Sequence, residues 1–361
     1  MWRKLFAWMH RSERHLSALA MVAGFVADNL LFGRVDLWQT QAVFAAYTVV
    51  CFTCIPLLHW TESRVERGRP RPRWRSVLPI LTQFSLGGFW SGFFVFYGRA
   101  AALPVSWPFM LLIVAMVIGN ELLHHYHDRL VFSSVLFFFA LYSYAIFAVP
   151  VFTHTMGTNT FLLSGAVAIA LFAAFTVLLR IAGRTRFLAD VTRIRVGAAA
   201  VFIVINLFYF TNILPPLPLS ATAAGVYHAV WRVPGAYLAT DESQSWAVRY
   251  LGAEPTLHVV PGESLYAYSA VFAPTDLTTI IVHRWQWRDP ATGQWVTKAA
   301  ISYPITGGRD GGYRGYSAVL MTEPGEWRVN VETVGGLLIA RVPFRVVDVA
   351  LPPSETTITL K

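Results

Sequence analysis

The chain has 361 residues, of which 55% are hydrophobic, 15% are aromatic and only 14% are charged. Soluble globular proteins carry about 25% charged residues, so this composition excludes a disordered chain, a coiled coil and an ordinary cytosolic enzyme. The formal net charge is +9, and its excess lies in residues 1–214, because residues 215–361 hold 11 basic and 12 acidic side chains. Composition therefore indicates a membrane protein whose polar residues are concentrated in part of its length.

Residues 1–214 are predicted to form a transmembrane helical domain. A spanning helix needs about 20 mostly apolar residues, and Gly and Pro are tolerated within it. Trp and Tyr residues gather near the ends of the apolar runs, where amphipathic rings favour the membrane interface. Seven runs qualify as predicted spans: 15–32, 39–60, 77–97, 107–123, 131–152, 160–181 and 196–214.

The basic residues between these runs predict the orientation. With the N-terminus inside, the cytoplasmic segments 1–14, 61–76, 124–130 and 180–195 hold 16 basic residues, and the opposite loops hold only Arg34 and Arg99. This asymmetry predicts a cytoplasmic N-terminus and, after seven crossings, an external C-terminal part. Because the positive charge lies in short loops, we expect it to face lipid headgroups and expect no nucleic-acid partner. The expected location is the bacterial inner membrane.

Residues 215–255 are predicted to be a Pro-rich neck and juxtamembrane segment, followed by a β domain over 256–361. The run Pro215-Pro216-Leu217-Pro218 cannot continue a helix. From about residue 256 the hydrophobic period becomes two, with predicted strands at 265–272, 279–288, 295–303, 313–321 and 337–347. Trp327, Val329 and Val331 alternate with polar residues in a further strand. Short alternating strands separated by turns predict an Ig-like sandwich of about seven strands.

The two cysteines, Cys51 and Cys54, both lie in the second predicted span. A Cys-x-x-Cys pair can mark a redox or metal site. Here no His or Cys partner accompanies it, so we expect apolar packing.

The run Asn120-Glu121-Leu122-Leu123-His124-His125-Tyr126-His127-Asp128 has the most chemical character in the chain. Glu121 and His124 share a helix face. Di-iron bundles use this Glu-x-x-His spacing, but they need two such motifs and two further carboxylates. The favoured interpretation is a polar cap at the cytoplasmic helix end, with no metal or other cofactor. A proton or ion path and a metal site are the alternatives.

Other polar residues within the predicted spans are also candidate sites. Asp28 lies toward the outer end of the first span, where placement near the interface is favoured over ion coupling. Gln83 in the third span is a candidate for an interhelical hydrogen bond. A transporter or membrane enzyme would use Asp28 together with Glu121–His127.

Four side chains of the β domain are candidates for contact with a partner: His283, Trp285, Arg314 and Trp327. Aromatic side chains at strand spacing can form a platform for a glycan. Such side chains more often form the core of a sandwich, and we favour this interpretation over the glycan platform.

Several short motifs lie from Pro215 onward: Pro215–Ser220, Ala224–His228, Ser269–Pro274, His283-Arg284-Trp285, Tyr313–Ser317 and Pro324–Val329. Together they resemble a bacterial envelope family known only as a domain of unknown function. Gly119-Asn120-Glu121 is similar to the membrane part that often precedes this domain. The resemblance implies a multi-span inner-membrane protein with a periplasmic β domain, and it brings no catalytic residues.

Two functions remain open at this stage. The first is a non-enzymatic envelope module, with no catalytic residues, whose β domain binds a protein or glycan partner. The second is the transporter or membrane-embedded enzyme described above, which is favoured by the observation that seven spans exceed what anchoring requires.

Overall fold

The computed structural model describes residues 33–70, 72, 75, 77–122, 130–242 and 254–360, with side chains 117 and 119–122 left out. These residues divide into two compact units. The helical unit comprises 33–98, Leu112–Tyr144 and Ala168–Val201. The β unit comprises Arg99–Leu111, Ala145–Val167 and 202–360. The predicted first span, 15–32, lies outside the described residues.

Six helices are described, and five of them are long and apolar enough to cross a membrane; the sixth, α5, is apolar over Leu103–Met116, the part whose side chains are described without a gap. Each corresponds to one of the predicted spans after the first. The main difference is at α8, which begins at Arg184 instead of residue 196, because Arg, Leu and Ala favour helix whether or not the segment is apolar. The helices are α3 (Trp38–Glu66), α4 (Val77–Ala100), α5 (Leu103–Leu122), α6 (Leu130–Thr153), α7 (Thr158–Ala182) and α8 (Arg184–Phe210).

Aromatic rings fill the core of the helical unit. The ring of Phe44 on α3 lies 5.6 Å from that of Phe93 on α4 and 5.5 Å from that of Tyr144 on α6, measured between centroids. Gly92 makes this approach possible, because a Cβ at that position would lie 2.4 Å from the Phe44 ring. Small residues at helix interfaces allow such close packing in membranes.

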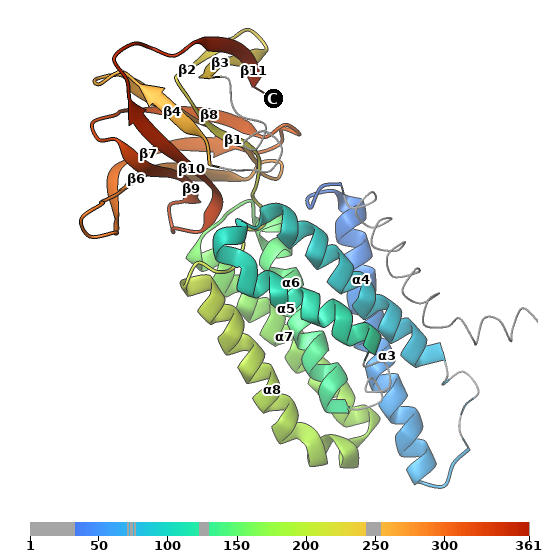
Figure 1. The fold of residues 1–361 in the computed structure, drawn as a ribbon. Coiled ribbons are helices and arrows are strands. Elements are labelled where there is room, and N and C mark those ends of the chain that lie inside the picture. Colours follow the sequence, from blue (N-terminus) through green and yellow to red (C-terminus); the bar gives the residue numbers. More distant parts are fainter. Residues whose placement is uncertain are drawn as a thin grey trace, which may run out of the picture. The chain divides into compact units, whose positions relative to one another are not determined.

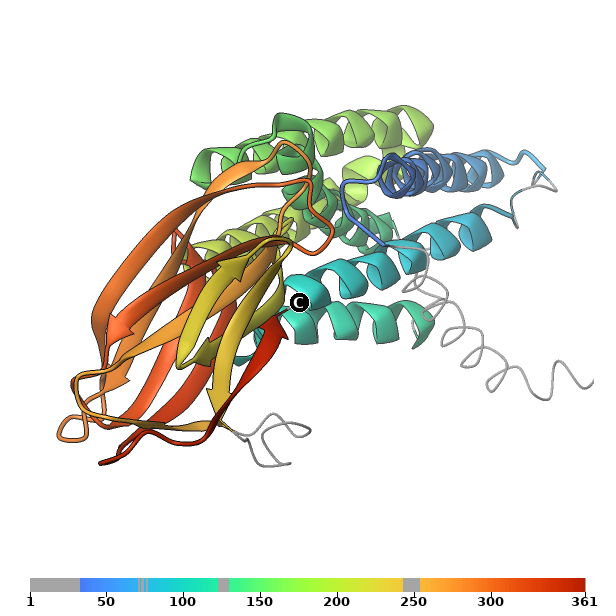
Figure 2. The ribbon, with the colours of Figure 1, turned by 90° about the horizontal axis from the view of Figure 1, so that it is seen from above.

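The β unit contains eleven strands in three sheets (Figure 1; Figure 2 shows the strands from above). The sheet orders are β1-β5-β8, β4-β10-β9-β6-β7 and β11-β3-β2. The strands are β1 (Ser220–Tyr227), β2 (Ala229–Val233), β3 (Ala236–Glu242), β4 (Thr256–Val259), β5 (Ser264–Phe272), β6 (Thr278–Arg288), β7 (Trp295–Thr306), β8 (Tyr313–Leu320), β9 (Gly325–Thr333), β10 (Leu338–Asp348) and β11 (Glu355–Leu360).

Strand β5 lies between two of these sheets and is buried on both faces. Its Leu265 and Ala267 pack into a core with Trp285 and Trp327 of the five-stranded sheet. Its Tyr268 and Ala270 pack on the opposite side, with Val230, Ala239 and Leu360 of the β11-β3-β2 sheet. The strands therefore form three layers, with β1-β5-β8 in the middle.

The predicted strands of the C-terminal part are confirmed, with small shifts at their ends, but the β structure begins earlier than predicted. Strands β1, β2 and β3 lie within 215–255, which the sequence predicted as neck and juxtamembrane segment. Strand β1 has three Ala and one Gly among its eight residues and only two β-branched residues, Thr222 and Val226. It is held by antiparallel pairing with β5, so tertiary context overrides its weak propensity.

Candidate functional site

The structure leaves the predicted intramembrane cluster largely undescribed. Asp28 and His124 lie outside the described residues, and for Asn120 and Glu121 it describes only helical backbone at the end of α5. Gln83 is half-buried on α4. The transporter or membrane-enzyme function that uses these residues stays a prediction.

Three of the four β-domain candidates are in the core. His283, Trp285 and Trp327 have no exposed surface, so their side chains have nothing with which to contact a partner in this fold. Arg314 is half-buried on β8 opposite Ala270, on a different sheet from the other three. The structure therefore does not bring the four candidates together on one surface.

His283 is the centre of a buried polar network between two sheets. Its Nε2 lies 2.8 Å from the Ser269 hydroxyl of β5, and its Nδ1 lies 2.9 Å from the Ser317 hydroxyl of β8. The indole of Trp285 donates to Ser317, and the Tyr303 hydroxyl lies 2.6 Å from Ser269. A hydroxyl on each side satisfies a neutral imidazole, which has one donor and one acceptor.

Burial lowers the pKa of His283 to about 4, so the imidazole is neutral at neutral pH. A serine hydroxyl beside a histidine is the arrangement of an activated nucleophile. Here both side chains are fully buried, with no route for a substrate. The network therefore holds the two sheets together and specifies their packing.

The outer face of the five-stranded sheet carries a line of polar side chains that the sequence analysis did not single out. Neighbours across antiparallel strands share a face, and the register pairs Arg284 and Gln286 of β6 with Asn330 and Arg328 of β9. Arg341 of β10 is opposite Asn330. We define the arginine face as the set Arg284, Gln286, Trp295, Arg328, Asn330, Glu332 and Arg341.

Hydrogen bonds connect the arginine face across three strands. Arg341 donates through Nε to the Asn330 side-chain oxygen at 2.8 Å, and Asn330 donates to the Gln286 side-chain oxygen at 3.3 Å. Arg328 donates through Nε to the same Gln286 oxygen at 2.8 Å, and its guanidinium lies 4.1 Å from the centroid of the Trp295 ring. Each long side chain is thus held in one orientation.

The arginine face is electropositive. Its one carboxylate, Glu332, is buried and pairs with Arg284 at 2.6 Å. Burial, followed by repulsion from Arg341, lowers the pKa of Arg328 to about 10. Burial also lowers the pKa of Arg341, partly offset by the attraction of Glu332. Both guanidinium groups remain charged at neutral pH, and each is partly stripped of solvent.

Exposed ion pairs border the arginine face at one end of the sheet. Glu326 of β9 pairs with Arg288 at 2.8 Å and with Arg345 at 3.4 Å. These arginines are about half exposed, so their pairing contributes little to stability. They add positive charge around the face.

A second polar cluster joins strands of two sheets in the β unit. The Glu242 carboxylate at the end of β3 lies 2.8 Å from Nε2 of His228 and 2.7 Å from Nδ1 of His258 on β4. Burial alone would raise the pKa of Glu242, but the hydrogen bonds from both histidines together lower it. Glu355 of β11 lies 3.6 Å from His228. The contacts of Glu242 with the two histidines are direct hydrogen bonds.

The helical unit has a polar cluster at the end of α3. Glu62 is bound by Arg75 at 2.8 Å and also pairs with Arg186 of α8. Arg186 reaches Glu66 as well, at 3.1 Å. Two of the basic residues predicted to lie in cytoplasmic loops, Arg75 and Arg186, thus form ion pairs with α3.

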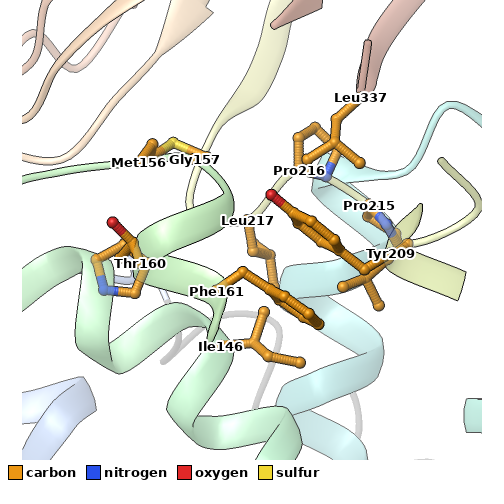
Figure 3. Close-up of a pocket in the computed structure, with 12 residues that line it drawn as sticks. Ile146, Met156, Gly157, Thr160, Phe161, Tyr209, Pro215, Pro216, Leu217 and Leu337 are labelled. Carbon is orange, nitrogen blue, oxygen red and sulfur yellow. The ribbon is translucent and has the colours of Figure 1, made fainter. Parts of the chain in front are cut away.

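A small cavity of about 30 Å³ lies in the β unit where the helix ends meet the Pro-rich segment (Figure 3). The rings of Phe161 and Tyr209 stack along one side, and Pro216, Leu217 and Leu337 close it. This volume holds about one or two water molecules and no substrate. Among the described residues, no group of three His, Cys, Asp or Glu side chains is placed to hold a metal ion.

One protein family matches part of the chain. Residues 278–346 match the family described as "Protein of unknown function (DUF2914)". A DUF2914 domain therefore lies here, in line with the resemblance to a domain of unknown function, and it contains every residue of the arginine face. No curated protein matches the chain significantly.

Two solved structures show weak likeness. A β-glucosidase from Listeria innocua in complex with glucose shares 17% identity over 32% of this chain, with a TM-score of 0.21; the aligned part spans 17% of the β-glucosidase. Pseudomonas fluorescens alkylpurine DNA glycosylase AlkC, bound to DNA containing an abasic site analog, shares 10% identity over 73% of this chain and 96% of its own, with a TM-score of 0.22. Likeness at this level carries no information about the function of this chain.

Proposed function

We propose that this chain is a non-enzymatic, multi-pass protein of the bacterial inner membrane. Its β domain is periplasmic and contains an Ig-like sandwich. This domain binds a protein or glycan partner of the envelope. In this proposal seven spans, including the one at 15–32, place the N-terminus in the cytoplasm. Five described helices of spanning length and the 16 basic residues on the cytoplasmic side of the predicted topology support it.

The observation that carries the binding role is the arginine face. Long polar side chains on an outer sheet face ordinarily move freely in water, and ordering each one costs conformational entropy. Here Arg328 and Arg341 are already ordered by Gln286 and Asn330. A surface organised before contact binds a partner at a lower entropic cost. The face also lies entirely within the DUF2914 match.

Site-specific photo-crosslinking in intact cells tests the binding role. A photoreactive residue at Ala300, which is exposed and opposite Arg284 on the arginine face, should give a discrete crosslinked product. The matched control is the same residue at Leu351, which is 79% exposed and lies outside the sheets. Sensitivity of the product to protease or to glycan-cleaving enzymes identifies the partner's class. Equal labelling from both positions, or none from Ala300, would contradict the proposal.

Enzyme fusions test the orientation independently. Alkaline phosphatase is active only outside the cytoplasm, so a fusion after Lys361 should be active and one between Arg64 and Arg75 should be inactive. The reverse pattern would overturn the proposed topology and leave the β fold unaffected.

A further inference from the structure

We propose that Arg328 and Arg341 bind an acidic segment of a partner protein in extended conformation, with one carboxylate on each guanidinium. This inference rests on the proposed binding function and names the chemistry of the partner. Among the described residues, neither has a carboxylate within ion-pair distance, although Glu332 attracts Arg341 from farther away; Arg284, Arg288 and Arg345 are each paired with a carboxylate.

The hydrogen bonds of Arg328 and Arg341 leave their outer edges available. Each donates through Nε to a neutral amide oxygen, of Gln286 and Asn330 respectively, so the bond fixes the plane of the guanidinium without neutralising it. The terminal Nη groups make no hydrogen bond to another described residue. A planar guanidinium with two parallel N–H groups matches a carboxylate in bidentate geometry.

Partial burial makes these two charges suited to an anion. Both arginines are half-buried, and their pKa values are lowered by burial and, for Arg328, by repulsion from Arg341. A carboxylate between or beside them relieves this repulsion. Charge-assisted hydrogen bonds strengthen as the local dielectric falls.

The spacing of the pair favours an extended peptide. Arg341 is opposite Asn330, two residues from Arg328 on the same face, so the two arginines are diagonal neighbours. Such neighbours lie about 7–8 Å apart. Side chains at positions i and i+2 of an extended chain lie on one side and are about 6.7 Å apart. Glu or Asp at alternate positions of a partner strand would therefore meet both guanidiniums.

Direct binding to defined probes tests this inference with the full-length protein in detergent. The probe is a fluorescein-labelled peptide of alternating Glu and Ser, and its control has the same composition with all Glu residues in one block. Fluorescence anisotropy should show tighter binding of the alternating peptide. Arg328→Gln and Arg341→Gln should each weaken it about tenfold or more. Arg345→Gln, on the same sheet but already paired with Glu326, is the matched variant and should change affinity less than threefold.

Further probes separate the alternatives. Tighter binding of polygalacturonate, an acidic glycan, or of phosphatidylglycerol vesicles than of the alternating peptide would overturn the peptide assignment. Equal affinity for the two peptides would overturn the spacing argument. If Ala300 crosslinks to an envelope partner in cells and the product persists in the Arg328→Gln, Arg341→Gln double variant, the proposed function stands and this inference fails. If Ala300 gives no product, the proposed function itself fails.

Discussion

The buried imidazole of His283 should make the stability of the β domain fall steeply in mild acid. In the folded protein its pKa is about 4, compared with 6.5 for an ordinary histidine. Between these values the unfolded chain binds a proton that the native state does not. Stability therefore decreases as the pH falls from 6.5 toward 4, and the contribution is fully present above pH 6.5.

The size of the effect follows from the two pKa values. The linkage relation gives a loss of about 2 kcal/mol between about pH 7 and pH 5, rising to about 3 kcal/mol near pH 4. Among the described residues, the imidazole ring contacts the hydroxyls of Ser269, Ser317 and Tyr303 and no carboxylate, so nothing there compensates a positive charge. His283→Gln keeps hydrogen-bonding groups in place but cannot titrate. It should therefore show a shallower loss of stability over the same interval.

The chain offers a selective probe for this measurement. Its only cysteines, Cys51 and Cys54, are in α3. Replacing both with Ala and introducing Ala267→Cys, at a position 2% exposed in the β core, makes thiol labelling report on unfolding of the β domain. The protein is kept in detergent, and the quantity compared at each pH is the urea midpoint of unfolding. Because a midpoint does not depend on the rate of labelling, changes in thiol reactivity with pH have little influence. Identical pH profiles with His283 and with Gln at this position would refute the reasoning.

Three further predictions are tested either by urea unfolding in the same Ala267→Cys protein or by the yield of folded protein on expression. Trp327→Ala should lower the free energy of unfolding by about 3–5 kcal/mol, because the ring is fully buried in the β core; an unchanged urea midpoint would place it outside the core. Gly92→Leu should reduce the yield of folded protein, because any Cβ there meets the Phe44 ring; normal yield would contradict the observed packing. Glu242→Gln should destabilise the β domain at neutral pH. That difference should shrink as the pH falls below 4.5, since the native carboxylate has a lowered pKa and loses its stabilising charge only in acid; a difference constant with pH would contradict this.

Local sequence was sufficient for the secondary structure of most of the chain. The apolar runs predicted α3 to α8, because a helix crossing lipid must be apolar and about 20 residues long. Alternation predicted β6 and β9, and it also showed which of their residues point inward: Trp327 and Val329 are buried and Arg328 lies on the other face. The connection between β6 and β7 contains Asp289, Pro290 and Gly293, residue types that favour turns.

Strand order and register were decided only by the tertiary structure. Alternation assigns Arg328 to the outer face, but it does not specify that β10 pairs with β9 and brings Arg341 opposite Asn330. The same limit applies to β5, whose burial on both sides requires a third sheet that includes β11, far away in sequence. Period and propensity act over a few residues, whereas the pairing of distant strands depends on the total packing of the domain. For this reason His283, Trp285 and Trp327 were visible as candidates from the sequence, and the arginine face emerged only with the fold.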